Sequence, residues 1–350
     1  MSRDVAENIP ANERGGHVPG PSLSEDVRPP ASRPEDGLVG RTSGATPTLS
    51  PIDAPVATRS ARQPSIGSRS PWLSTLRTLA RDPTALLGAA LLLIVVLAAA
   101  GAPIVAPYDP LQVHVRDRLQ LPSTTYLLGT DELGRDLLSR LIYAARVSLA
   151  VGVVAVLIAA VGGVSLGLIA GFFGGNVDAV TMRCMDAVLA FPAIILALAI
   201  ISALGPSPVN AMIAIGIVTI PSFARITRGS LLSLKEREFV EASRASGATD
   251  NYLMLRVLLP NTLSPILVQC SIAFASAILT EAALSFLGLG VQPPTPSWGS
   301  MLDFGRKYLT QTPWYSVSAG AAIFVAVLSL NLLGDGLRDA LDPRIRRASA

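Results

Sequence analysis

Six long apolar segments with almost no charge constrain the fold of this chain more than any other feature of its sequence. A helix that spans a membrane needs about 20 mostly apolar residues. In lipid such a segment must satisfy its own backbone hydrogen bonds, which a helix does. The sequence therefore predicts an all-α membrane protein with six transmembrane helices, at Thr84–Ala106, Val147–Gly175, Ala187–Leu204, Val209–Ala224, Leu263–Leu289 and Tyr315–Gly334.

Composition agrees with a membrane protein and argues against several other classes. The 350 residues are 50% hydrophobic with a net charge of only +3, so we do not expect nucleic acid as a partner. Two histidines (His17, His114) and two cysteines (Cys184, Cys270) are too few for a metal site or a disulfide framework. The chain contains neither a G-x-x-x-x-G-K-[ST] phosphate loop nor a credible nucleophile arrangement. We therefore expect no catalytic, cofactor-binding or metal-binding residues, and a conduit rather than an enzyme.

The first 70 residues have a different composition from the rest of the chain. They contain ten prolines and no Phe, Trp or Tyr, with eight acidic residues balanced by eight arginines. Such a segment buries too little apolar area to offset the entropy of ordering, so residues 1–70 are predicted to be a disordered cytoplasmic tail. Residues 71–83 follow with apolar residues at helical spacing and interleaved arginines, which predicts an amphipathic helix on the membrane surface.

The distribution of Arg and Lys around the spans predicts their orientation. One set of flanks holds fourteen of these residues and the other holds seven, so the richer set is placed in the cytoplasm. With six spans, both termini are then cytoplasmic. Residues 107–146 become an extracytoplasmic loop, and residues 147–344 a five-helix core that contains a cytoplasmic loop at residues 229–262.

Small residues and prolines inside the spans indicate close packing between bent helices. Gly163, Gly167 and Gly171 repeat every four residues and line one face of the second span, which allows another helix to approach its backbone. Pro192 and Pro221 lie inside the third and fourth spans, where kinks are tolerated if neighbouring groups satisfy the freed carbonyls.

The cytoplasmic loop is predicted to be an elbow of two helices joined at a glycine. Leu231–Ser246 contains no Pro or Gly and reads as the first helix, with a nearly flat face of small residues. Gly247 permits a turn with positive φ. Asp250 can cap the second helix, Asp250–Leu259, which Pro260 then ends.

The same loop carries a motif. Its residues are Glu241-Ala242-Ser243, Gly247 three residues later, and Val257-Leu258-Leu259-Pro260 after nine more. This arrangement resembles the EAA loop of ABC importer permeases, which reads E-A-A, three residues, G, nine residues, I-x-L-P. Ser243 and Val257 depart conservatively from that pattern. The resemblance implies that Glu241, Ala242, Ser243, Gly247, Val257, Leu259 and Pro260 form a coupling loop that docks on a cytoplasmic ATPase.

Three further stretches resemble the C-type subunit of the dipeptide/oligopeptide/nickel permeases. They are Leu127–Gly152, Thr280–Leu302 and Asn331–Arg344, and the whole resemblance runs from about Trp72 to Arg347. It implies the type I ABC importer permease (MetI-like) fold, in the inner membrane of a bacterial cell. The implied partners are a B-type permease subunit, two ATPase subunits that use ATP and Mg, and an extracytoplasmic solute-binding protein. The implied cargo is a peptide or a related small solute.

Glu281 is the one charge within the fifth span, and two interpretations of it stand side by side. The carboxylate either lines a pore near the outer mouth or, as we prefer, bonds to the partner permease or lies near the headgroups. Other functions also stay open. The chain could be an ion-coupled secondary transporter, a membrane anchor, or a permease of the same family that carries a nickel chelate or another non-peptide solute.

Overall fold

This computed structural model describes residues 79–341, which all belong to one compact unit. The predicted tail and most of the predicted helix at residues 71–83 lie outside the described residues. Helices make up the regular secondary structure of the described region, where the only β-type pairing is an isolated bridge between Thr130 and Asp136.

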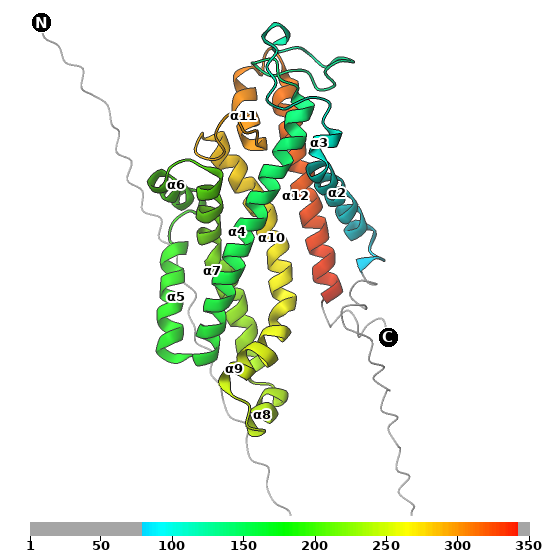
Figure 1. The fold of residues 1–350 in the computed structure, drawn as a ribbon. Helices are drawn as coiled ribbons and strands as arrows, with labels where there is room; N and C mark the ends of the chain where they lie inside the picture. The colour runs from blue at the N-terminus through cyan, green and yellow to red at the C-terminus, as the bar shows by residue number, and fades with distance from the viewer. Residues whose placement is uncertain (1–78, 342–350) are drawn as a thin grey trace, which may run out of the picture. The chain divides into compact units, whose positions relative to one another are not determined.

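The helices follow one another along the chain and are shown in Figure 1. Their bounds are α2 (Pro83–Ala100), α3 (Ala102–Val105), η1 (Val115–Asp117), α4 (Leu137–Phe173), α5 (Gly175–Leu189), α6 (Ala193–Leu204), α7 (Pro208–Lys235), α8 (Glu238–Ala245), α9 (Asp250–Tyr252), the π-helical turn η2 (Leu253–Leu258), α10 (Leu259–Phe286), α11 (Trp298–Lys307) and α12 (Pro313–Leu341).

Within residues 79–341, five helical segments are long and apolar enough to cross a membrane: α2, α4, α7, the continuous run Asp250–Phe286, and α12. A sixth crossing results if α5 and α6 are taken together as one bent span. The predicted all-α membrane fold is therefore confirmed. The helices of three predicted spans extend well beyond their apolar stretches, because α4, α7 and α12 continue into polar sequence at one end.

The third span is not the continuous helix that its apolar run predicted. α5 ends at Leu189, α6 begins at Ala193, and their axes differ by 88°. Pro192 explains the break, because it has no N–H to donate and forces the preceding residue out of helical geometry. The bend turns α6 away from α5, toward the N-terminal half of α7 (Figure 1).

Short polar side chains start the long helices. Asp136 accepts hydrogen bonds from the backbone N–H and the hydroxyl of Ser139 at 2.8 and 2.7 Å, which caps the first turn of α4. The hydroxyl of Ser207 accepts from the N–H of Asn210 at 3.1 Å and does the same for α7, whose first residue is Pro208. These caps fix where α4 and α7 begin, toward the end of the bundle that carries the loop between α3 and α4.

The most extensive helix–helix contact within residues 79–341 joins α4 to α7. A Cβ atom on Gly163 would lie 2.5 Å from the carbonyl oxygen of Ile220, and one on Gly167 would lie 2.5 Å from that of Ala224. A Cβ atom on Gly171 would lie 2.8 Å from the Leu231 side chain. The predicted glycine face is therefore confirmed, and it runs along three turns of α4 and lets the two backbones touch.

Two ion pairs connect α5 to α7. The Arg228 guanidinium donates through both Nε and Nη2 to the carboxylate of Asp178, with Nη2 and Oδ2 2.6 Å apart. Arg225 donates to Asp186 at 2.6 Å, and both of these side chains are about half exposed. The first pair is bidentate and partly buried, so it positions α5 more firmly than the second.

At the opposite end of the bundle, a buried cluster of charges fixes the loop between α3 and α4. Asp131 is fully buried, and its carboxylate lies 2.6 Å from Nε of Arg135 and 3.3 Å from Nε of Arg140. Arg140 also donates to the carbonyl oxygen of Pro110 at 3.1 Å. The cluster therefore joins both ends of the loop to the first turn of α4.

Helix α11 caps this end of the bundle. Ser297 and Ser300 form a reciprocal capping box at its start. The indole N–H of the buried Trp298 donates to the carbonyl oxygen of Leu141 on α4 at 3.1 Å. The Pro-rich segment before α11 is thus ordered and covers this end of the bundle.

The α4–α7 contact yields a prediction about stability. We expect Gly167→Ala to lower the free energy of unfolding by about 1–3 kcal/mol, because the new Cβ atom would overlap the α7 backbone. Gly229→Ala is the matched control, since a Cβ atom there meets nothing within 4 Å. Thermal melting of the purified protein in detergent measures both, and equal melting temperatures would contradict the proposed backbone contact.

The charge cluster yields a second prediction. Asp131→Asn removes the carboxylate that two buried guanidinium groups share and leaves Arg135 with Glu132 alone, so we expect a loss of about 3–5 kcal/mol in unfolding free energy. Asp186→Asn removes one member of a half-exposed pair and should cost about 0–1 kcal/mol. Denaturant titration of both variants tests this ranking, which a loss at Asp186 equal to that at Asp131 would overturn.

Candidate functional site

The predicted coupling loop forms a compact elbow at the end of the bundle where α7 and α10 meet (Figure 1). The predicted single helix Leu231–Ser246 is wrong, because α7 ends at Lys235 and α8 starts at Glu238, with extended backbone at Arg237. In one straight helix, Leu231 and Val240 would be about 13 Å apart on opposite faces. The break lets both side chains bury in the same apolar cluster.

That cluster fastens the elbow to the bundle. It joins Leu168 and Phe172 of α4 to Leu231 of α7, Val240 of α8, and Leu253 and Leu258 of η2. Lys235 adds a polar connection, since its ammonium donates to the carbonyl oxygen of Phe172 at 2.6 Å. Packed side chains therefore connect α8 to the ends of α4 and α7.

The outward face of α8 carries small residues beside the larger exposed side chains of Phe239 and Arg244, and the predicted flatness of this face stays a prediction. Val240 is its only buried residue, while Glu241 and Ala242 are exposed. The hydroxyl of Ser243 donates to the carbonyl oxygen of Phe239 at 2.8 Å, so it is satisfied within the helix. The small residues border a hollow of about 610 Å³ lined by Ala242, Ser243, Ser246, Gly247, Ala248, Thr249 and Tyr252.

Gly247 makes the turn between the two arms of the elbow. Its φ is +84°, which confirms the predicted left-handed conformation. Its N–H donates to the carbonyl oxygen of Arg244, and that of Ala248 donates to Ser243, which closes the end of α8. Thr249, not Asp250, precedes the next helix, and no side-chain cap is made there. The predicted capping role of Asp250 is therefore wrong.

Pro260 does not end a helix, so the predicted helix end at this proline is wrong. The helix runs without interruption from Asp250 to Phe286 and widens into the π-helical turn η2 just before the proline. A π-turn and polar side chains let a helix pass a residue that has no N–H. Here the Asn261 side-chain amide donates to the carbonyl oxygen of Val257 at 2.6 Å. Val257 and Leu259 pack against the elbow cluster, so the motif continues directly into a span.

Glu281 lies inside the helix bundle and is fully buried. Its carboxylate accepts from the hydroxyl of Ser148 on α4 at 2.9 Å and from that of Ser285 at 2.7 Å. The hydroxyl of Ser285 also accepts from the N–H of Val291 at 3.0 Å. Neither interpretation made from the sequence anticipated this environment within the chain. The serines could have suggested it, because Ser285 is one helical turn from Glu281. The idea that Glu281 lines a pore stays a prediction.

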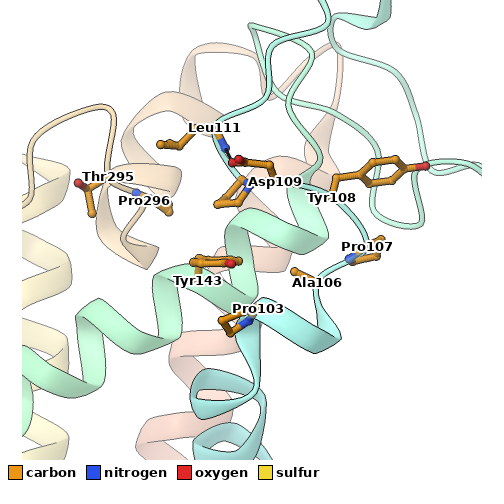
Figure 2. A pocket seen from close by; sticks show the side chains of 10 residues that line it. Pro103, Ala106, Pro107, Tyr108, Asp109, Leu111, Tyr143, Thr295 and Pro296 are labelled. Atoms are coloured by element: carbon orange, nitrogen blue, oxygen red, sulfur yellow. Dashed lines mark hydrogen bonds between the residues drawn. The ribbon is translucent and has the colours of Figure 1, made fainter.

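A pocket of about 630 Å³ opens at the loop end of the bundle (Figure 2). Figure 2 shows Tyr143 of α4 with Asp109 above it and Pro103 below it, and Pro296 to the left. Asp109 accepts from the N–H of Leu111 at 2.8 Å. The segment at residues 103–111 and the segment at residues 295–296 lie some 190 residues apart in the chain. No local pattern in the sequence predicted that they would meet.

The loop beside this pocket is held in part by a buried phenol. Tyr126 packs its ring 5.5 Å from that of Tyr108 and donates to the carboxylate of Asp117 at 3.0 Å. Burial raises the pKa of the Tyr126 phenol, and the hydrogen bond to Asp117 raises it further. The phenol therefore stays a neutral donor at neutral pH, and the loop is rigid next to the pocket.

No group of three or more His, Cys, Asp or Glu side chains within residues 79–341 is arranged to hold a metal ion. The elbow likewise consists of an exposed helix, α8, and a glycine turn, and not of a cluster of reactive groups. What this arrangement can do is receive a partner and transmit its movement.

Comparison with known proteins agrees with this geometry. Residues 163–347 match the family described as "Binding-protein-dependent transport system inner membrane component". Residues 70–122 match the "N-terminal TM domain of oligopeptide transport permease C".

Named relatives cover most of the chain. The di/tripeptide transport system permease protein DppC of Pseudomonas aeruginosa (strain UCBPP-PA14) is 46% identical over 83% of this chain and 97% of its own length. The dipeptide transport system permease protein DppC of Alkalihalophilus pseudofirmus is 43% identical over 79% of this chain and 91% of its own. The glutathione transport system permease protein GsiD of Escherichia coli O1:K1 / APEC is 44% identical, over 79% and 92%. The chain is therefore a multi-pass ABC permease and belongs to the family of binding-protein-dependent transport system inner membrane components.

Proposed function

We propose that this chain is one half of the pore of an ATP-driven importer that carries peptides across the inner membrane of a bacterial cell. The observation that carries the proposal is the elbow. It presents an exposed surface that carries small residues, and buried side chains join that surface directly to the ends of α4 and α7. Such an arrangement suits the receipt of a mechanical input from another subunit.

The proposed partners follow from this role. Two cytoplasmic ATPase subunits would use ATP and Mg, one of them seated on α8 with Glu241 at the contact. A B-type permease would form the other half of the pore. An extracytoplasmic solute-binding protein would deliver cargo at the end that carries α11 and the pocket of Figure 2. This orientation places both termini in the cytoplasm, in accord with the distribution of Arg and Lys.

Transmission in the proposed cycle passes through the elbow cluster. When the ATPase subunits close, they would displace α8, and Val240 would carry that displacement to Leu231 and Phe172. Because the glycines of α4 lie directly on the α7 backbone, the two spans would move as one body. α10 would follow through η2, whose wide turn is continuous with it.

Peptides are the cargo that we propose, because relatives named for dipeptide or di/tripeptide transport cover most of the chain. Other relatives of similar identity are named for the transport of glutathione, which is a small peptide-like solute. A nickel chelate or another non-peptide solute is the alternative within the same family. An ion-coupled mechanism is the alternative outside it, although the carboxylate of Glu281, near the end of α10, is hydrogen-bonded to two serines.

Uptake into vesicles tests the proposed function. The chain is co-expressed with the neighbouring permease, ATPase and binding-protein genes, and the purified complex is reconstituted in liposomes. We expect uptake of a radiolabelled dipeptide that requires ATP and binding protein, and that excess nickel chelate does not inhibit. Uptake driven by a proton gradient without ATP would contradict the proposal, and competition by the chelate alone would contradict the cargo.

The turn at Gly247 yields a further prediction. Valine at a φ of +84° is strained by about 1–2 kcal/mol, although a side chain there meets nothing within 4 Å. We therefore expect Gly247→Val to change the angle of the elbow and reduce ATP-driven uptake about tenfold, with assembly retained. Gly229→Val, at an open helical position, is the control. Equal uptake by the two variants would count against the elbow as the transmitting joint.

A further inference from the structure

Helix α5 is attached to the rest of the described structure by very little packing. Only Met185 of its 15 residues is buried, whereas nine of the 28 residues of the neighbouring helix α7 are buried. Segments with few buried apolar contacts are the ones that move at a low cost in free energy. The question is therefore what holds α5 in its place beside α7.

Both ends of α5 are built as hinges. At its start, Gly174 and Gly175 have φ angles of +66° and +53°, and a Cβ atom on either would meet nothing within 4 Å. Two consecutive glycines in open space can change their backbone angles without a collision. At the other end, the 88° break at Pro192 separates α5 from α6. Helix α5 can therefore turn as a rigid rod between these two breaks.

Two ion pairs hold this rod against α7. Asp178, in the first turn of α5, makes the bidentate pair with Arg228, and Asp186, two turns further along, pairs with Arg225. The exposed fractions of these four side chains range from 19% to 51%. Because water reaches all of them, it can solvate the charges when the pairs separate. The two pairs can therefore open and close without leaving a void or a buried charge.

The glycine hinge lies directly behind the elbow. Phe172, two residues before Gly174, belongs to the elbow cluster, and its carbonyl oxygen accepts from the ammonium of Lys235 at 2.6 Å. Lys235 is the last residue of α7, the helix that carries both arginines of the ion pairs. A displacement of the elbow would therefore act on the hinge of α5 and on the helix to which α5 is attached.

We propose that α5 is a hinged strap, that the two ion pairs latch it to α7, and that displacement of the elbow releases it. A fixed strut is the alternative, but a strut would need apolar packing along its length, and one buried residue does not supply it. The release step rests on the proposed function, because an ATPase seated on α8 supplies the displacement. The latch itself does not depend on that function.

Spin labels test the latch in the reconstituted full transporter without nucleotide. Cys184 is exposed on α5, and Asp339→Cys places a second label on α12, on the opposite side of the bundle (Figure 1), in a chain that carries Cys270→Ala. The distance between the labels is measured by double electron–electron resonance. We expect one narrow distribution of distances, and a distribution about twofold wider when Asp178→Asn opens the bidentate pair.

Two further variants separate a latch from general damage to the fold. Asp303→Asn is the matched control, since it removes the carboxylate that Arg306 and Lys307 share on α11 and should leave the distribution unchanged. Asp178→Arg alone should widen the distribution, and its combination with Arg228→Asp should narrow it again, because the exchanged charges attract each other. Equal distributions in all of these proteins would overturn the latch.

Trapping the ATPase subunits with ATP and vanadate tests the release. A second sample carries Asn251→Cys, on the exposed surface of the elbow, with Cys184→Ser and the same label at residue 339. We expect trapping to change both distances. An elbow that moves while the distance from Cys184 stays fixed would overturn the proposed release. An elbow that does not move would contradict the proposed function instead, and the nucleotide-free comparison would still decide the latch.

Discussion

The rest of the described structure depends on the backbone contact between α4 and α7. Gly163, Gly167 and Gly171 bring α4 and α7 together over three turns, at a separation that any side chain would prevent. Because the contact is made by backbone, it resists sliding and rotation more than a contact between flexible side chains would. The ion pairs of α5, the cluster beneath the elbow and the packing of α10 are all built on this pair.

The two ends of this frame serve different purposes. At one end, short helices and a glycine turn hold the exposed surface of the elbow away from the bundle, and a small apolar cluster and the Lys235–Phe172 hydrogen bond connect it to the bundle. At the other end, buried charges, a capping box and a buried tryptophan make a rigid platform around the mouth of a pocket. A movable joint at one end and a fixed platform at the other fit a subunit that receives force on one side of the membrane and a delivered solute on the other.

Much of this arrangement could be predicted from the sequence, because it follows from local rules. The length of the apolar runs predicted the spans, and a four-residue glycine repeat predicted the close face of α4 that contacts α7. A glycine between two polar helical runs predicted the positive φ at residue 247. The motif residues Glu241, Ala242 and Gly247 do lie together at the tip of the elbow.

What could not be predicted depends on tertiary contacts. Pro260 reads as a helix end, yet the helix continues because a π-turn and the Asn261 amide compensate for the missing N–H. Pro192 reads as a kink in a span and instead turns the chain by 88°. Ser148, a partner of Glu281, and Arg228, the partner of Asp178, lie 133 and 50 residues away in sequence, so no local pattern could identify these two contacts.

The central claim is that the elbow receives a cytoplasmic ATPase, and site-directed cross-linking in native membranes tests it most directly. Ser243→Cys places a thiol on the exposed helix α8, and Thr295→Cys places one beside the pocket at the opposite end, both in a chain in which Cys184, which is exposed, is replaced by Ser. With a short bifunctional maleimide, the account predicts that Ser243→Cys gives an adduct containing the ATPase subunit and that Thr295→Cys does not. No ATPase adduct from Ser243→Cys, or one from Thr295→Cys instead, would contradict both the docking surface and the orientation of the chain.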